Sequence, residues 1–128
     1  ALLHVESRFD PLAVSPTGAL GLGQFLRSTW EDVAQMLGEP PADPFDPEAS
    51  IRYAARYLRW LMDRCAAYRG LEQVACAVTA YNGGIGYTLR GIAREGDLYA
   101  FLHFQERDEP REYLAQVLSA YAAYRATP

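Results

Sequence analysis

Residues 1–9 read ALLHVESRF, a short apolar segment that contains one carboxylate, Glu6. Positions 2, 5, 6 and 9 follow the i, i+3, i+4, i+7 spacing of one helical face, and all but Glu6 are apolar. Glu6 falls on that face, so it is predicted to point toward the buried side of a helix. A carboxylate in apolar surroundings keeps its proton to higher pH, as a general acid requires. The alternative is a structural ion pair with Arg8 or Arg27.

A glycine-rich turn follows this helix, which the Asp-Pro pair at 10–11 is expected to stop. Gly18, Gly21 and Gly23 occur within six residues, which indicates tight turns or the close approach of another segment. A phosphate-binding loop is excluded because no Gly-Lys-Ser/Thr follows and the chain has no Lys. Gln24 is predicted to donate and accept hydrogen bonds with a sugar amide or hydroxyl, although an ordinary connecting loop would also explain the pattern.

A polar pair stands at the end of a later helix. Residues 71–81 are mostly apolar at helical spacing, and Asn82, Gly83 and Gly84 are residue types that end helices. These three residues therefore have a complete explanation as a cap. Tyr81 and Asn82 nevertheless place polar groups at a helix end, where binding sites are often built.

These segments together resemble a known family. ESRFDP (6–11), SPTGALGLGQFL (15–26), AYNGG (80–84) and EPREYL (109–114) are similar to motifs of the soluble lytic transglycosylase (SLT) domain family. That family resembles goose-type lysozyme in fold and cleaves the β-1,4 bond between N-acetylmuramic acid and N-acetylglucosamine in peptidoglycan. The resemblance runs in order over about residues 1–125.

The resemblance implies roles for particular residues. Glu6 would be the single catalytic acid and then base, and Tyr81 and Tyr113 would hold it by hydrogen bonds. The residues implied to contact substrate are Ser15, Gln24, Tyr81, Asn82 and Tyr113. Those implied to support the site are Ser7, Gly21, Leu26 and Gly83. The sequence departs from the family pattern at four positions, which are Asp10, Gly23, Leu26 and Pro110.

The expected reaction is non-hydrolytic cleavage that leaves a 1,6-anhydromuramoyl end. One alternative is a true lysozyme with water as the nucleophile and Asp10 as the nearest second carboxylate. Another is an inactive wall-binding module of a phage tail or secretion system. The expected location is periplasmic, associated with the cell wall, or virion-borne.

Composition limits the partners. The 128 residues are expected to form one catalytic domain, 1–128, cut from a longer protein. Twelve basic residues against sixteen acidic ones give a net charge of −4, which argues against nucleic acid. No metal-ligand spacing is present, so neither metal nor cofactor is expected, and the domain is expected to be monomeric. Peptidoglycan glycan strands are the expected partner.

Cys65 and Cys76 lie at similar distances from a turn near Gly70. Residues placed symmetrically in a helical hairpin can face one another. A disulfide needs Cα atoms within about 7 Å, which is closer than helix axes usually pack. Buried free thiols are therefore the expected state, with a disulfide as the alternative.

The rest of the chain predicts further helices. Ser28–Glu31 is read as a capping box that opens a helix ending at Gly38, and Asp46 as the N-cap of a long helix. No period-2 strand signal is present. A mainly α, lysozyme-like domain with a substrate cleft is therefore expected. The remaining helices are predicted at 28–37, 47–68, 85–94, 97–104 and 110–125.

Overall fold

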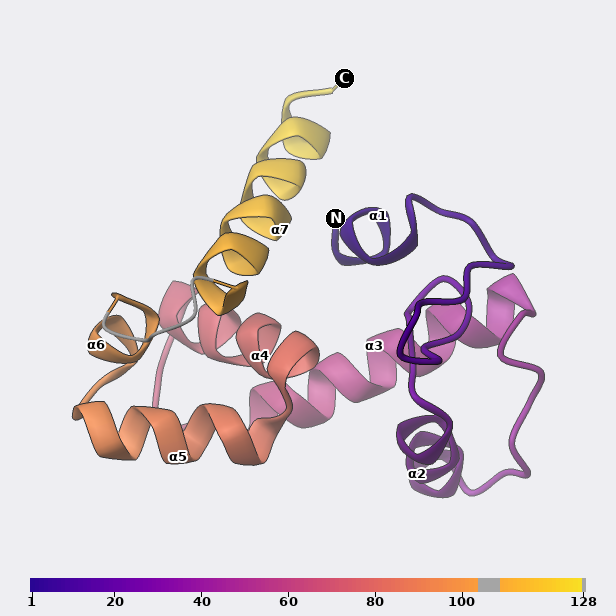
Figure 1. Cartoon of the computed structure of the whole chain (residues 1–128), viewed down its shortest axis with the longest axis horizontal. Coiled ribbons are helices and arrows are strands. Elements are labelled where there is room, and N and C mark those ends of the chain that lie inside the picture. The colour runs from indigo at the N-terminus through magenta and orange to yellow at the C-terminus, as the bar shows by residue number, and fades with distance from the viewer. Residues whose placement is uncertain (104–108, 128) are drawn as a thin grey trace. The chain divides into compact units, whose positions relative to one another are not determined.

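The structure is a computed structural model that describes residues 1–103 and 109–127. Over these ranges the chain is mainly α-helical, as the sequence predicted, and the helices are α1 (Leu2–Ser7), α2 (Arg27–Leu37), α3 (Pro47–Arg64), α4 (Leu71–Gly83), α5 (Ile85–Glu95), α6 (Leu98–His103) and α7 (Glu109–Ala126) (Figure 1). The predicted end of the sixth helix at residue 104 lies outside the described residues.

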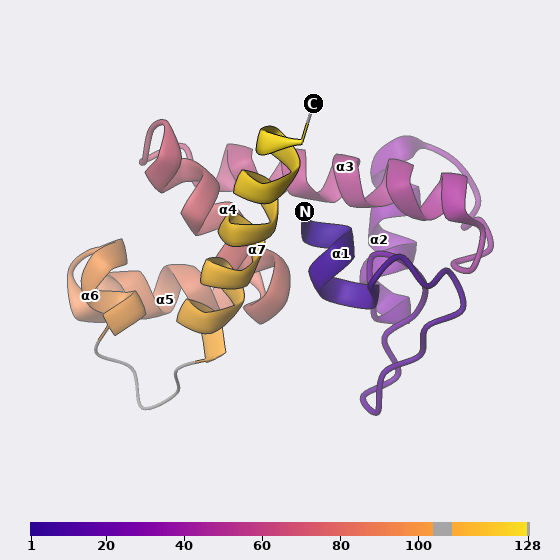
Figure 2. The same cartoon turned by 90° about the horizontal axis from the view of Figure 1, so that it is seen from above.

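The chain divides into two compact units, Ala1–Tyr57 and Leu58–Pro128, with the boundary inside α3. The first unit holds α1, α2 and the glycine-rich loop between them. In the second unit α4 contacts α5 and α7, and α6 contacts α5 and α7 (Figure 2).

Two helix boundaries follow the chemistry predicted for them. Asp46 caps α3, because its Oδ2 accepts a hydrogen bond from the Ala49 N–H at 2.8 Å and Pro47 is the first helical residue. Gly38 ends α2 in the left-handed conformation (φ 70°). Local side-chain chemistry was sufficient to set both ends.

The predicted capping box at Ser28–Glu31 is wrong. Helix α2 begins at Arg27, its N-cap is Leu26, and no side chain caps it. The cause is the preceding loop, in which Leu20 and Phe25 exchange two backbone hydrogen bonds of 2.9 and 3.1 Å. This pairing ends the extended backbone at Leu26, so the helix starts before Ser28 can serve as its cap.

The buried face of α3 includes a polar residue. Ser50 and Tyr53 are fully buried, Ala54 and Leu61 are buried, and Ile51 is 51% exposed. The stripe through positions 50, 53, 54 and 61 keeps the i, i+3, i+4 spacing of one helical face, and Ser50 is a polar member that apolar patterning does not detect.

Aromatic rings form the centre of the first unit. Trp30 stacks on Tyr53 with ring centroids 4.0 Å apart, and Phe25 meets both Trp30 and Tyr57 edge to face. Phe25, Trp30 and Tyr53 are all buried. Edge-to-face and offset arrangements suit the charge distribution of aromatic rings. This cluster fixes α2 against the first half of α3.

The second unit has a core with two distinctive features. A Cβ on Gly91 of α5 would lie 2.0 Å from the Phe101 ring, so glycine is required for α6 to pack on α5. Thr79 and Thr88 are fully buried, and within the described ranges the structure gives their hydroxyl oxygens no hydrogen-bond partner. An unsatisfied buried hydroxyl lowers stability.

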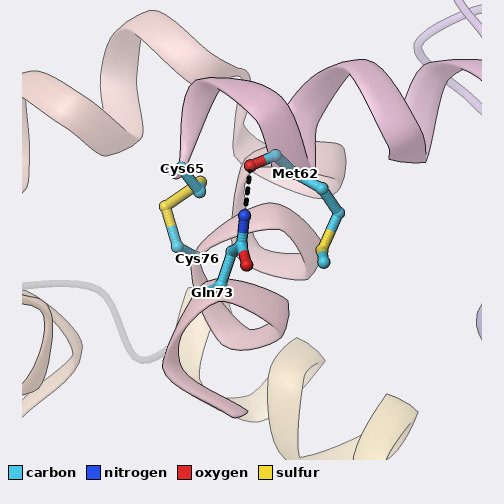
Figure 3. The surroundings of a disulfide bond; sticks show 4 residues. All are labelled: Met62, Cys65, Gln73 and Cys76. Carbon is cyan, nitrogen blue, oxygen red and sulfur yellow. Dashed lines mark hydrogen bonds between the residues drawn. A yellow bond between two sulfur atoms is a disulfide. The ribbon is translucent and has the colours of Figure 1, made fainter. Parts of the chain in front are cut away.

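Cys65 and Cys76 form a disulfide with a Cα–Cα distance of 6.0 Å, and both are fully buried (Figure 3). The expectation of free thiols is therefore wrong. Helix α3 ends at Arg64 and not near residue 68, so Cys65 lies in the turn after the helix, where the chain can approach α4 more closely than two helix axes would. A second tie lies beside the disulfide, where Gln73 Nε2 donates to the Met62 carbonyl at 2.9 Å.

Candidate active site

Glu6 lies near the end of α1 and is half-buried. The helix ends at Ser7, and Arg8 (φ 52°) and Phe9 (φ 63°) follow in left-handed conformations. Phe9 is therefore off the helical face; it is 52% exposed and stacks on His4. The predicted buried face is wrong in extent, since no residue of α1 is fully buried. The helix is too short to carry the full apolar stripe.

Two polar side chains near Glu6 in the sequence form hydrogen bonds with the backbone. Ser7 Oγ donates to the Leu3 carbonyl at 3.1 Å, one turn back in α1. Asp10 Oδ1 accepts from the Leu12 N–H at 2.9 Å, which is an Asx turn. The carboxylate of Asp10 is therefore engaged in the turn that follows the Glu6 helix.

The glycine-rich loop approaches a distant segment closely at Gly21. A Cβ on Gly21 would lie 2.1 Å from the Pro44 carbonyl oxygen, and its φ is +67°. The Gly21 N–H also donates to the Ala13 carbonyl at 2.9 Å. Gly18 has a different role, because open space surrounds it and its N–H closes a turn on the Ser15 carbonyl. Close approach and tight turning, the two predicted uses of glycine, are thus met at different residues.

Gln24 has a left-handed backbone (φ 50°) and a half-buried side chain. Its Nε2 donates to two carbonyl oxygens, those of Gly21 at 2.9 Å and Ala13 at 3.2 Å. An amide nitrogen carries two hydrogens, so both are used inside the protein. In this structure the donor side of Gln24 therefore faces the protein, and its Oε1 is the group left to accept from a ligand. Donation from Gln24 to a ligand stays a prediction.

These bonds connect the loop to the segment that follows Glu6. Ala13 lies seven positions after Glu6, and its carbonyl accepts from both Gly21 and Gln24. Arg8, Phe9 and Gln24 are the non-glycine residues with positive φ within the ranges that the structure describes. Strained backbone of this kind clusters at functional sites.

Ser15 and Leu26 lie at the edges of this loop. Ser15 Oγ accepts from the Ala19 N–H at 3.0 Å and shares a hydrogen bond with Thr17 Oγ1 at 2.9 Å. Its hydroxyl therefore shapes the 15–19 turn. Leu26 is 49% exposed and immediately precedes α2.

The loop between α2 and α3 carries Pro44 and is itself firmly held. Trp30 Nε1 donates to the Ala42 carbonyl at 2.9 Å, and the Tyr53 hydroxyl accepts from the Ala42 N–H at 3.3 Å. Tyr53 also donates to Glu39 at 2.8 Å. These hydrogen bonds fix the backbone next to Pro44, whose carbonyl lies against Gly21.

An ion pair completes this support. Arg52 donates to Glu39 Oε2 at 2.8 Å. This hydrogen bond, followed by that from Tyr53, lowers the pKa of Glu39 below its ordinary value of 4.5. Burial raises the pKa of Tyr53 above 10.0, so its phenol stays neutral and able to donate.

Four predicted site residues, Tyr81, Asn82, Gly83 and Tyr113, belong to the second unit. Tyr81 (half-buried) and Asn82 (exposed) are in the last turn of α4, which continues through Gly83. Gly84 (φ 84°) is the residue that ends the helix, so Asn82 is helical and does not cap it. Tyr113 is buried in α7, which contacts α4.

One residue of the loop region was missed from the sequence. The Ser50 hydroxyl, fully buried on α3, accepts a hydrogen bond from the Gly23 N–H at 3.1 Å. Its position four residues before buried Ala54 was the available signal. A small polar residue on the buried face of a helix needs a hydrogen-bond partner.

Sequence comparisons identify the family of this chain. Residues 1–104 match the model of the transglycosylase SLT domain, and the chain belongs to that family. It is 34% identical to membrane-bound lytic murein transglycosylase C of Serratia proteamaculans and 35% identical to that of Pectobacterium atrosepticum. Each comparison covers 98% of this chain and 41% of the relative, so the chain spans less than half the length of these relatives.

Family membership confirms the expected lysozyme-like helical class. The match ends before residues 109–114, the predicted final motif with Tyr113. Within the described parts of the chain, no helix combines the length and apolarity that crossing a membrane requires.

Proposed function

We propose that this chain is the catalytic domain of a peptidoglycan lytic transglycosylase, with Glu6 as its single acid and base. The observation that carries the proposal is the SLT family match combined with the placement of Glu6. This half-buried carboxylate precedes two left-handed residues and is followed by a segment tied to the Gln24 loop. The relatives' name, lytic murein transglycosylase, supports the same activity.

In the proposed reaction, protonated Glu6 donates its proton to the glycosidic oxygen as the C1–O bond of N-acetylmuramic acid breaks. The substrate's own N-acetyl group stabilises the developing oxocarbenium charge, so no second catalytic carboxylate is needed. Ionised Glu6 then takes the proton from the 6-hydroxyl of the same sugar, whose oxygen bonds to C1. The tethered hydroxyl outcompetes water because its effective concentration is high.

The other predicted residues assist this reaction in the proposal. Tyr81 and Tyr113 hydrogen-bond Glu6, and Asn82 lies beside the N-acetyl group. Gln24 accepts from a sugar hydroxyl or amide through Oε1. Ser15 faces the N-acetyl or peptide region of the substrate.

The hydrolytic alternative has less support. It requires a second group to activate water, and Asp10 was the nearest candidate. The Asp10 carboxylate accepts the Leu12 N–H, which favours a role in the turn.

The decisive experiment is mass spectrometry of the products from purified peptidoglycan. The unchanged domain should release anhydromuramoyl products, and Glu6→Gln should release none while keeping its circular dichroism spectrum. Glu31→Gln, the same change at an exposed residue of α2, is the matched control and should remain active. Products heavier by one water would show a lysozyme, and retained turnover in Glu6→Gln would remove Glu6 from its role.

We further propose that the domain works outside the cytoplasm, in contact with the cell wall. The buried Cys65–Cys76 disulfide supports this location, because such bonds form and persist in oxidising compartments. Thiol alkylation of the denatured protein, taken directly from its native cells, should find both cysteines blocked. Complete alkylation without prior reduction would contradict the proposed location.

A further inference from the structure

The hydroxyl of Ser50 reaches a backbone amide far away in sequence. It accepts the Gly23 N–H at 3.1 Å across 27 positions, and both residues are buried. A hydroxyl buried on the apolar face of a helix lowers stability unless it forms a hydrogen bond. Ser50 forms this bond with the backbone amide of Gly23. The partner lies within the Gly21–Gln24 turn.

The same turn is held at its other end by different contacts. Gly21 rests against the Pro44 carbonyl, and its N–H bonds the Ala13 carbonyl. The Gln24 side chain in turn bonds the carbonyl of Gly21. The backbone of this turn therefore determines where the Gln24 side chain lies.

Gln24 itself has a conformation that residues with a side chain rarely adopt, with φ 50°. Such a conformation persists only where the surroundings fix it. Gly23 is the residue immediately before Gln24, and its N–H is anchored by Ser50. Losing this anchor would remove the hydrogen bond that ties the turn to α3 and free the turn to relax.

We propose that Ser50 is a positioning residue that sets the orientation of Gln24 through the Gly23 amide. The inference rests on the proposed function, in which Gln24 Oε1 accepts a hydrogen bond from the sugar. Ser50 does not touch the substrate. It fixes the turn from which Gln24 reaches it.

The activity test is a double-mutant cycle. Ser50→Ala should lower kcat/KM on purified glycan strands by about tenfold, the loss typical of one buried hydrogen bond. In a Gln24→Ala background the same change should have an effect of less than about twofold, because non-additivity marks residues that act through one another. Full additivity, or wild-type kcat/KM in Ser50→Ala, would overturn the proposal.

Two control variants separate positioning from stability. Ser28→Ala is the same change at an exposed residue of α2 and should leave both activity and melting temperature unchanged. Val33→Ala removes packing from the core of the same unit and should lower the melting temperature without loss of activity where the protein is folded. An equal loss of kcat/KM in Val33→Ala would show that Ser50→Ala acts through stability alone.

A measurement independent of catalysis tests the geometry directly. In NMR spectra, Ser50→Ala should speed hydrogen exchange at the Gly23 amide and shift the side-chain amide resonances of Gln24. Ser28→Ala should change neither. If the unchanged domain cleaves no peptidoglycan, the proposed function fails, and these resonances still decide the positioning role. Unchanged Gly23 exchange and Gln24 resonances would overturn it.

Discussion

Removing the Cys65–Cys76 disulfide should destabilise the domain by an amount that follows from its place in the chain. The two cysteines are 11 positions apart. Cross-linking a loop of this length restricts the unfolded chain and stabilises the folded state by about 2.8 kcal/mol at 25 °C in the chain-entropy model. For a chain of 128 residues this corresponds to a fall in melting temperature of about 10 °C on reduction.

The assay is thermal unfolding followed by circular dichroism, with and without a thiol reductant. The Cys65→Ala/Cys76→Ala double variant provides the control. It should melt below the oxidised parent, and reductant should not change its melting temperature. The fall in melting temperature in this variant should exceed the fall caused by reduction alone, because both side chains are fully buried and their truncation also removes packing.

The Gln73–Met62 hydrogen bond, the second tie at this corner, allows a sharper test. It remains available when the disulfide is opened, so Gln73→Ala should cost more in the reduced protein than in the oxidised one. A reduction effect below about 3 °C would refute the chain-entropy estimate. If Gln73→Ala lowered the melting temperature equally in both redox states, the disulfide and the Gln73–Met62 hydrogen bond would not hold the same part of the chain together.

Three further outcomes are expected. Gly21→Ala should lower the free energy of unfolding by about 3–5 kcal/mol in denaturant melts, because its Cβ would overlap the Pro44 carbonyl and its φ is positive. Gly18→Ala, in open space, should lower that free energy by only about 1 kcal/mol. Glu39→Gln should lower the melting temperature at pH 7, and the difference should shrink as the pH falls below 4.5. The pKa of Glu39 is lowered in the folded state, so the stability contributed by its ionised form is present above pH 4.5 and is lost as the pH falls through the folded-state pKa. A constant difference at all pH values would contradict this assignment. Thr88→Val should raise stability by about 1 kcal/mol, since it removes a hydroxyl without a described partner; a loss would indicate a bound water there.

The sequence predicted best what is determined locally. Asp46 before a proline and Gly38 after an apolar helix act through their immediate neighbours, so both boundaries were confirmed. The capping box at Ser28–Glu31 has an equally good local pattern, yet it was wrong. Pairing between Leu20 and Phe25 had already set the start of the helix. Local sequence patterns therefore predict a helix boundary correctly where no contact with a preceding segment already sets it.

The contacts of the candidate site were less predictable because most link distant residues. Nothing in the sequence near Gly21 indicates Pro44, and nothing near Gly23 indicates Ser50. The state of Cys65 and Cys76 was predicted wrongly from the sequence, because the geometry of the disulfide depends on where α3 ends. The motifs identified the family correctly, while the roles of individual residues remain predictions.

The hydrogen bonds of Gln24 restrict the chemistry of any inhibitor aimed at this loop. With both amide hydrogens held by backbone carbonyls, the side chain offers a lone pair and no proton. If a sugar hydroxyl meets Gln24 as proposed, an analogue that carries fluorine in place of that hydroxyl could not donate to it, although its shape would change little. An amino or hydroxyl substituent would keep the match, so hydrogen-bond polarity rather than size should separate the analogues that bind from those that do not.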